Sequence, residues 1–238
     1  MDEKKTTERE EIITEVIGFS PRKLRTTFLD LLLKPGLAIA AYSDGDRSKY
    51  ISPIAYFLIS YGGSFIIYEL SGYYSHMHEK GEIAKMISMF DSSFQSNPEL
   101  REAFLRSFHI VFSKNVILLF SVPAYFVSWW LVFRRFRKPV LNHVYFFLFI
   151  SAQAGFLMLL PHLILFWSFS FTTVLLWLDR VIGFVLFFLA AKVFYRISYT
   201  QTIVRVLVSQ YILIYLPLAF FLFGTQAVIT LAIYLFKL

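Results

Sequence analysis

The histidines are the side chains of this sequence whose types best suit chemistry. His76, His78 and Glu79 lie within four residues of one another, and His109 lies in the same predicted loop, with His162 near the same face. Imidazole and carboxylate groups are ligands for zinc or copper, and the His-x-His spacing suits an extended strand or loop. The alternative is a polar loop whose histidines never meet. The sequence favours this alternative, because no second short-spaced pair of ligands accompanies the first.

Motifs for other chemistry are missing from the sequence. The chain has no cysteine, which excludes disulfides, thiolate catalysis and cysteine-ligated metal centres. It has no His-Glu-x-x-His motif, and Gly62-Gly63-Ser64-Phe65 lacks the flanking glycine of a nucleophile elbow. Only the region of His109 and His162 offers a base near membrane depth. We therefore expect a protein that is not an enzyme and has no cofactor.

The composition predicts the fold class in which these residues are held. Of 238 residues, 57% are apolar and 16% are charged, and there are 28 Phe, 14 Tyr and 4 Trp. Soluble domains have about 25% charged residues, so a soluble chain of this size could not bury so much apolar surface. Aromatic side chains also gather at membrane boundaries. The sequence thus predicts an all-α, polytopic transmembrane helical bundle.

Five apolar runs are long enough to cross about 30 Å of hydrocarbon, which takes about 20 helical residues. They cover residues 51–70, 112–133, 144–167, 178–195 and 209–235. Residues 168–178 are apolar enough to extend the fourth span, and the last run, which contains Pro217, suits one tilted helix or two short ones. The predicted organisation is a polar tail (1–20), an interfacial segment (21–50) and a transmembrane domain (51–238) with an outer loop (71–111).

The distribution of Lys and Arg predicts the orientation. With the N-terminus inside, the predicted cytoplasmic segments hold 16 of the 23 Lys and Arg residues. The clearest local signal is the basic loop Arg134-Arg135-Phe136-Arg137-Lys138. We expect a multi-pass protein of the bacterial inner membrane with a cytoplasmic N-terminus. Its net charge of +7 then meets anionic lipid headgroups rather than nucleic acid.

Residues 21–50 predict an interfacial segment before the first span. Leu24, Phe28, Leu31 and Leu32 recur at helical spacing beside basic residues, in a helix too short and too charged to span. We expect this amphipathic helix to stop at Pro35-Gly36, before a turn at residues 43–46. The alternative is an unstructured polar lead-in.

The same segment contains a pattern that resembles a known family. The pattern is R-T...KPG...Y..G.R..Y..P, formed by Arg25, Thr26, Lys34, Pro35, Gly36, Tyr42, Gly45, Arg47, Tyr50 and Pro53. It resembles the opening block of an uncharacterised bacterial membrane family, a domain of unknown function. That family often carries an N-terminal zinc ribbon, which is absent here, and a later Glu-His block, which Asn142-His143 matches only in part. The resemblance implies a shared fold and no activity. A weaker similarity is to the five-span Yip1 family.

The resemblance and the basic residues together predict a structured collar formed by this block on the cytoplasmic face of the bundle. Gly36 and Gly45 relax the backbone where the chain turns. Arg25, Arg47 and Lys49 stand where headgroups or helix C-terminal carbonyls attract cations, and Arg47 is predicted to be the electrostatic anchor.

Few polar residues lie within the predicted spans. Gln153, Gln226 and the pair Asp179-Arg180 are the candidates, and amides among small residues typically join packed helices. This favours a non-catalytic protein that organises membrane components or binds a membrane-protein partner or a second copy of itself. The alternatives are a small transporter or channel and, less favoured, a membrane enzyme with a periplasmic histidine site.

The outer loop is predicted to hold two helical pieces. Ile83, Met86, Ile87 and Phe90 share one helical face. Asn97-Pro98-Glu99 has the residue types of a helix start, so a second helix should run from Pro98 toward the second span.

Overall fold

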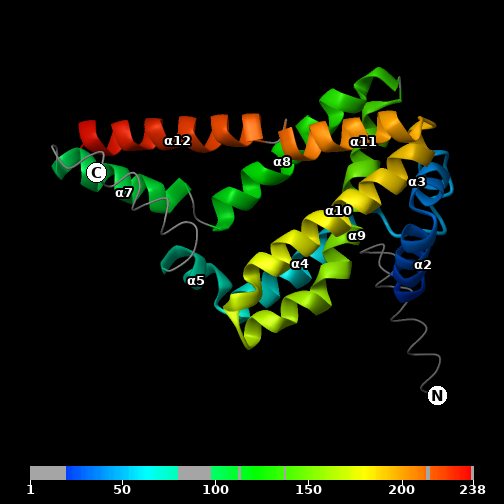
Figure 1. The fold of residues 1–238 in the computed structure, drawn as a ribbon, viewed down its shortest axis with the longest axis horizontal. Helices are drawn as coiled ribbons and strands as arrows, with labels where there is room; N and C mark the ends of the chain where they lie inside the picture. Colours follow the sequence, from blue (N-terminus) through cyan, green and yellow to red (C-terminus); the bar gives the residue numbers. More distant parts are fainter. Residues whose placement is uncertain (1–19, 80–97, 112–113, 137, 213–214, 237–238) are drawn as a thin grey trace, which may run out of the picture. The chain divides into compact units, whose positions relative to one another are not determined.

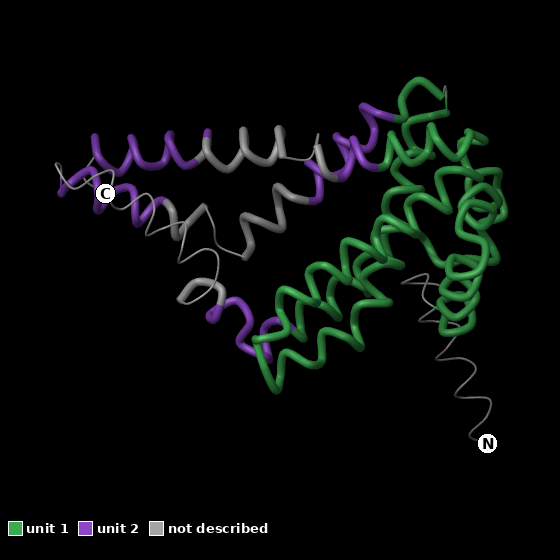
Figure 2. The backbone as a smooth tube through the Cα atoms, in the orientation of Figure 1, with its two compact units in different colours: residues 1–67, 133–206 green, residues 68–132, 207–238 purple. Residues whose placement is uncertain are grey.

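The computed structural model describes residues 20–79, 98–111, 114–136, 138–212 and 215–236. It is all-α, with no strand among those residues (Figure 1). The chain divides into two compact units, each assembled from separated stretches (Figure 2). Unit 1 is residues 1–67 and 133–206, and unit 2 is residues 68–132 and 207–238. The predicted fold class is therefore confirmed.

Unit 1 contains most of the described helices. Its α-helices are α2 (Pro21–Leu33), α3 (Pro35–Ser43), α4 (Pro53–Leu70), α9 (Val140–His162), α10 (Thr172–Tyr195) and α11 (Tyr199–Leu207). Short 3₁₀ turns lie between them, namely η2 (Arg134–Phe136), η3 (Leu163–Phe166) and η4 (Phe169–Phe171). The last residues of α4 and α11 pass into unit 2. Unit 2 holds α5 (Tyr73–Glu79), α7 (Pro98–Val111), α8 (Lys114–Phe133), the π-helical turn η5 (Val208–Ile212) and α12 (Tyr215–Phe236).

Three helical stretches of the described chain are long and apolar enough to cross a membrane. They are Pro53–Leu70, Val140–Phe166 and Phe169–Tyr195, with 18, 27 and 27 residues. They lie at the places of the predicted first, third and fourth spans. Helices α8 and α12 occupy the places of the second and fifth spans and have 20 and 22 residues. The count of five spans stays a prediction that depends on those two helices.

The fourth helix begins at Thr172 rather than at residue 178, so the extension that the apolar residues allowed is present. In the last apolar run, residues 208–212 form the π-helical turn and Tyr215–Phe236 form α12. Residues 213–214 lie outside the described residues, so the choice between one helix and two stays a prediction.

The interfacial segment forms two helices. The first ends at Leu33 with Lys34 (φ −142°) as its C-cap, directly before the predicted stop at Pro35-Gly36. The second helix was not predicted, and Pro35 occupies its first turn. A proline disfavours helical geometry in the residue before it and suits the first turn of a new helix. The turn after α3 is confirmed, since Asp44 ends the helix and Gly45 has φ +116°.

Helix α9 is the centre of unit 1. It packs against α2, α3 and α10, and its inward side chains Phe146, Phe149, Ile150 and Met158 are at most 1% exposed. Tyr42 of α3 meets Tyr145 and Phe149 edge to face, with ring centroids 5.1 and 5.2 Å away. Residues 21–50 are therefore part of the core of unit 1 and not an unstructured lead-in.

In unit 2, α7 packs along α12. Helix α7 begins at Pro98 and runs to Val111, which confirms the second helix predicted in the outer loop. The first predicted helix, around residues 83–90, lies outside the described residues.

Candidate functional site

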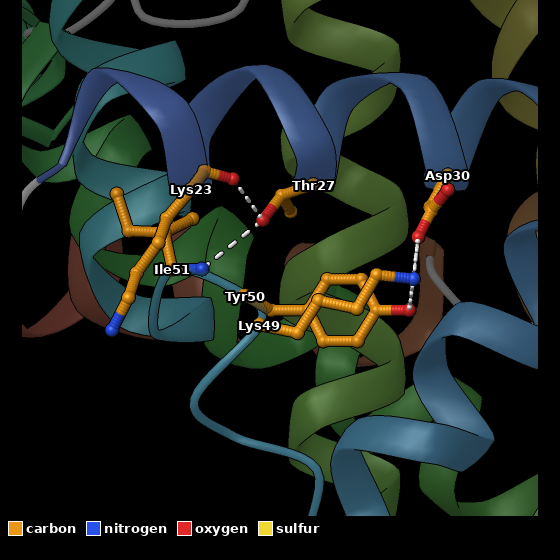
Figure 3. A network of polar contacts seen from close by, with 6 residues as sticks. All are labelled: Lys23, Thr27, Asp30, Lys49, Tyr50 and Ile51. Atoms are coloured by element: carbon orange, nitrogen blue, oxygen red, sulfur yellow. Dashed lines mark hydrogen bonds and ion pairs between the residues drawn. The ribbon is translucent and has the colours of Figure 1, made fainter.

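The collar, defined as residues 21–50, is joined to unit 1 by a buried threonine. Thr27 has no exposed surface, and its hydroxyl donates to the Lys23 carbonyl at 2.7 Å. The same oxygen accepts the backbone N–H of Ile51 at 3.0 Å, just before α4 begins (Figure 3). One hydroxyl thus satisfies a buried N–H that belongs to no helix. It fixes the two ends of the collar to each other.

An ion pair makes a second connection between the ends of the collar. The Lys49 ammonium donates to Asp30 Oδ2 at 2.7 Å, and the buried Tyr50 hydroxyl donates to the same oxygen at 3.0 Å (Figure 3). Burial raises the pKa of the Asp30 carboxyl, but the hydrogen bonds from Lys49 and Tyr50 outweigh it and leave the pKa below its ordinary value. The bond to Asp30, followed by that to Tyr50, raises the pKa of Lys49. No sequence pattern predicted this pair, because its members are 19 residues apart.

Gly36 lets α3 approach α10 closely. A Cβ built at Gly36 would lie 2.5 Å from the Val193 Cβ and 2.7 Å from the Ala190 carbonyl oxygen. Both distances are shorter than real contacts of this kind, and the carbonyl belongs to the backbone of α10. Pro35 beside it is also buried. The Pro-Gly step of the sequence pattern therefore permits close packing of α3 on α10, and the collar is an integral part of the helix bundle.

Arg47 and Arg25 lie on the outside of the collar. The Arg47 guanidinium stands over the rings of Tyr42 and Tyr145, 5.8 Å from each centroid. The guanidinium thus contacts two aromatic faces, while Lys49 makes an ion pair within the collar. Arg25 is exposed. A role for either arginine toward lipid headgroups stays a prediction.

An aromatic floor lies where α9 begins and α10 ends. We use this name for Phe133, Phe136, His143, Phe194 and Tyr195. His143 is 1% exposed and its Nδ1 bonds the Tyr195 hydroxyl at 2.7 Å, while its Nε2 is buried without a hydrogen-bond partner among the described residues. The sequence pointed to His143 only through the family resemblance. The structure places it at a junction of elements that are distant in sequence.

Two cations stand over this floor. Lys138 Nζ lies 4.2 Å from the centroid of the Phe194 ring, and Arg205 Cζ, from α11, lies 4.9 Å from that of Phe136. The two rings flank Tyr195, with centroids 4.9 and 5.4 Å from it. The sequence marked Lys138 only as part of the basic loop and did not mark Arg205, because only the fold brings α11 to η2.

The polar residues within the apolar helices join neighbouring helices, as predicted. Gln153 accepts a hydrogen bond from the Tyr56 hydroxyl of α4, and Ser60 donates to the Ala152 carbonyl at 2.8 Å. In unit 2, the Gln226 amide donates to Ser107 at 2.7 Å, which links α12 to α7. One amide atom of each glutamine, Gln153 Nε2 and Gln226 Oε1, has no partner among the described residues.

Asp179 and Arg180 lie on the exposed surface of α10, two turns after its start. The Arg180 guanidinium stands over the Trp177 ring, 5.5 Å from its centroid. The contact is made within one helix.

The predicted histidine ligands lie mostly outside the residues whose side chains the structure describes. His76, His78 and Glu79 lie on α5, so the pair is helical rather than extended, and positions i and i+2 of a helix do not face each other. The described residues contain no cluster of three or more His, Asp or Glu able to hold a metal. The side chains of His78, Glu79 and His109 lie outside the described residues, and His162 belongs to unit 1. The metal site therefore stays a prediction, which the metal content of the purified protein would test.

Comparison with known proteins supports the resemblance of the N-terminal block and nothing wider. No match was found among curated proteins or among solved structures. The similarity to the Yip1 family is not supported, since no family other than the one below was found. Residues 22–65, which form the collar and most of α4, match the family described as "Protein of unknown function (DUF3667)".

Proposed function

We propose that this protein is a non-catalytic, membrane-organising component of the bacterial inner membrane. In this proposal its N-terminus is cytoplasmic, and its collar lies in the lipid interface as a surface for lipid and for a membrane-protein partner. The proposal concerns the block that matches the family of unknown function.

The outer face of the collar is the observation that carries this proposal. Leu29, Leu32, Leu33 and Leu37 are 40, 40, 73 and 57% exposed. The opposite face of α2, with Thr27 and Leu31, is buried. Arg22, Arg25 and Lys34 are exposed beside these leucines. Exposed leucines flanked by cations are the arrangement of a helix that inserts its apolar side among acyl chains and places its charges among anionic headgroups.

The position of the collar along the chain agrees with an interfacial role. Only residues 51–52 separate the collar from α4, an apolar helix of 18 residues. Helix α4 presents Ile54 and Leu58 on its surface, 61 and 62% exposed, so its lipid-facing side begins in its first turn. If α4 crosses the bilayer, the collar lies at the boundary where it enters.

Site-specific fluorescence tests the proposal. The chain has no cysteine, so Leu33→Cys and Asp44→Cys each give a single site for an environment-sensitive dye. We expect the dye at residue 33 to shift to the blue in vesicles and to be quenched by lipids brominated in their acyl chains. The dye at residue 44, in the exposed turn, should report water. Equal, water-like emission at both sites would overturn the proposal.

A small transporter or channel is the second candidate, and one observation favours it. Gln153 is fully buried in the centre of α9, yet its Nε2 has no partner among the described residues. An amide donor at that depth can contact a passing polar solute. Ion or solute flux into proteoliposomes that Gln153→Leu abolishes would support this function, and equal, background-level flux for both proteins would count against it.

A further inference from the structure

We propose that α7 and the apolar stretch Gln226–Leu235 of α12 form an amphipathic pair that lies in the plane of the membrane surface. In this arrangement the outer side of α12 contacts lipid acyl chains, and the charged side of α7 faces water. The inference goes beyond the proposed function, because it concerns unit 2 and does not depend on the collar. It also gives the end of the last apolar run a role other than that of a fifth membrane span.

A polar seam joins the two helices. The hydroxyl oxygens of Ser107 and Thr230 are 2.6 Å apart. The Gln226 amide donates to Ser107 at 2.7 Å and to the Phe104 carbonyl at 3.1 Å. Residues 104–107 of α7 therefore lie level with residues 226–230 of α12, and the two helices run side by side in the same direction (Figure 1). Gln226 and Thr230 mark the side of α12 that faces α7.

The side of α12 away from the seam is apolar and exposed. Val228, Leu231 and Leu235 are 69, 55 and 62% exposed. At about 100° per residue, they lie about 140–200° around the helix from Gln226. These three side chains form an apolar strip that points away from α7.

The exposed side of α7 is charged at the same level. Its exposed charged residues are Glu99, Arg101, Glu102 and Arg106. Arg106 pairs with Glu102 at 2.6 Å, and their side chains are 58 and 65% exposed. Each of the two lies within about 3 Å, along the helix axis, of a seam residue. If α12 crossed the bilayer at this level, both charges would enter the hydrocarbon layer, where ionised side chains facing lipid are costly. The cost is avoided when the charged side faces water and the apolar strip faces lipid.

The connection to α8 indicates a membrane boundary beside the pair. Helix α7 ends at Val111, and only residues 112–113 separate it from α8. Helix α8 has 20 residues, and its single charged residue, Lys114, is the first of them. If α8 crosses the bilayer as the sequence predicts, α7 ends where α8 enters. Acyl chains are then the apolar medium within reach of the strip on α12.

Depth measurement in vesicles tests the arrangement. The chain has no cysteine, so Val228→Cys, Leu231→Cys and Leu235→Cys each give one site for an environment-sensitive dye in the full-length protein. Each position is more than half exposed, so the substitutions should be tolerated. In vesicles of phosphatidylcholine and phosphatidylglycerol, we expect lipids brominated in their acyl chains to quench all three dyes at the same shallow depth. Glu99→Cys, on the charged side of α7, is the matched control and should report water.

The other outcomes would overturn the inference. Depths that differ by about 10 Å between residues 228 and 235, at about 1.5 Å per residue, would show that α12 crosses the bilayer. Water-like emission at all three sites would show that the strip does not contact lipid. Blue-shifted emission without quenching would show that protein covers the strip, and crosslinking of Leu231→Cys between two chains would identify that protein as a second copy. The dye at residue 33 reports on unit 1, so failure here would leave the proposed function standing.

Discussion

At the scale of single residues, the collar depends on polar groups that sequence reasoning overlooked. In the sequence, Thr27 is one of two adjacent threonines in a predicted amphipathic helix. In the structure it is fully buried, and its hydroxyl bonds both to the Lys23 carbonyl of its own helix and to the Ile51 N–H. The Thr27 hydroxyl satisfies a buried backbone N–H that water cannot reach, and a methyl group or a surface threonine could not do so.

Removal of the Thr27 hydroxyl should therefore destabilise the collar. Thr27→Val keeps the shape of the side chain but leaves the Ile51 N–H without its partner, which should cost about 1–3 kcal/mol of unfolding free energy. Thermal unfolding of the detergent-solubilised protein measures the change. Thr26→Val is the matched control, because Thr26 is only half-buried. Equal melting temperatures for the two variants would contradict the assignment.

The Asp30–Lys49 pair should give stability a defined pH range. The folded pKa of Asp30 is lowered, so its contribution is present above the unfolded pKa of about 3.9 and is lost as the pH falls through the folded value. The folded pKa of Lys49 is raised, so its contribution is present below about pH 10.4 and is lost as the pH rises through the folded value. The effect should be small, because the side chains are 47 and 33% exposed.

Melting curves of the wild type and of Asp30→Asn between pH 3 and pH 8 test this expectation. The wild type should be the more stable protein near neutral pH, and the difference should shrink as the pH falls below about 4 toward the lowered pKa of the folded Asp30 carboxyl. Asp46→Asn, in the exposed turn, is the control and should show no such difference. A constant difference across the range would show that the pair is not the cause.

At the scale of elements, the contact between α3 and α10 decides the position of the collar. It depends on Gly36, where any Cβ would meet the α10 backbone. Gly36→Ala should push the helices apart and cost about 1–3 kcal/mol, as overpacking does. Gly62→Ala is the control, since a Cβ there meets nothing within 4 Å and alanine favours the helix. Size-exclusion profiles and melting temperatures compare the two, and equal tolerance would show that α3 can move away from α10.

At the scale of the whole molecule, orientation remains to be measured. Cysteines introduced at Asp44 and Pro139 should be protected from an impermeant thiol reagent in intact cells, and one at Ser92, in the predicted outer loop, should react. The distribution of Lys and Arg is the physical reason, because cationic loops resist translocation. The opposite labelling pattern would reverse the orientation and remove the basis of the cytoplasmic collar.

The sequence by itself determined the features that depend on short stretches of chain. Long apolar runs specify helices that can cross a membrane, wherever those helices lie. Gly45 sets the turn after α3, because the backbone preferences of glycine act within a residue or two. The N-terminal pattern was also readable, since the matched block is continuous in the chain.

Only the tertiary structure decided the features that depend on residues far apart. Pro35 and Gly36, expected at a helix end, form the start of a helix packed on α10, and Lys49 pairs with Asp30. The fold also places Lys138 over the Phe194 ring and Arg205 over the Phe136 ring. Hydrophobic periodicity shows that a helix has an apolar side, but its partner follows from the packing of the whole unit. Contacts between distant residues leave no local period in a single sequence.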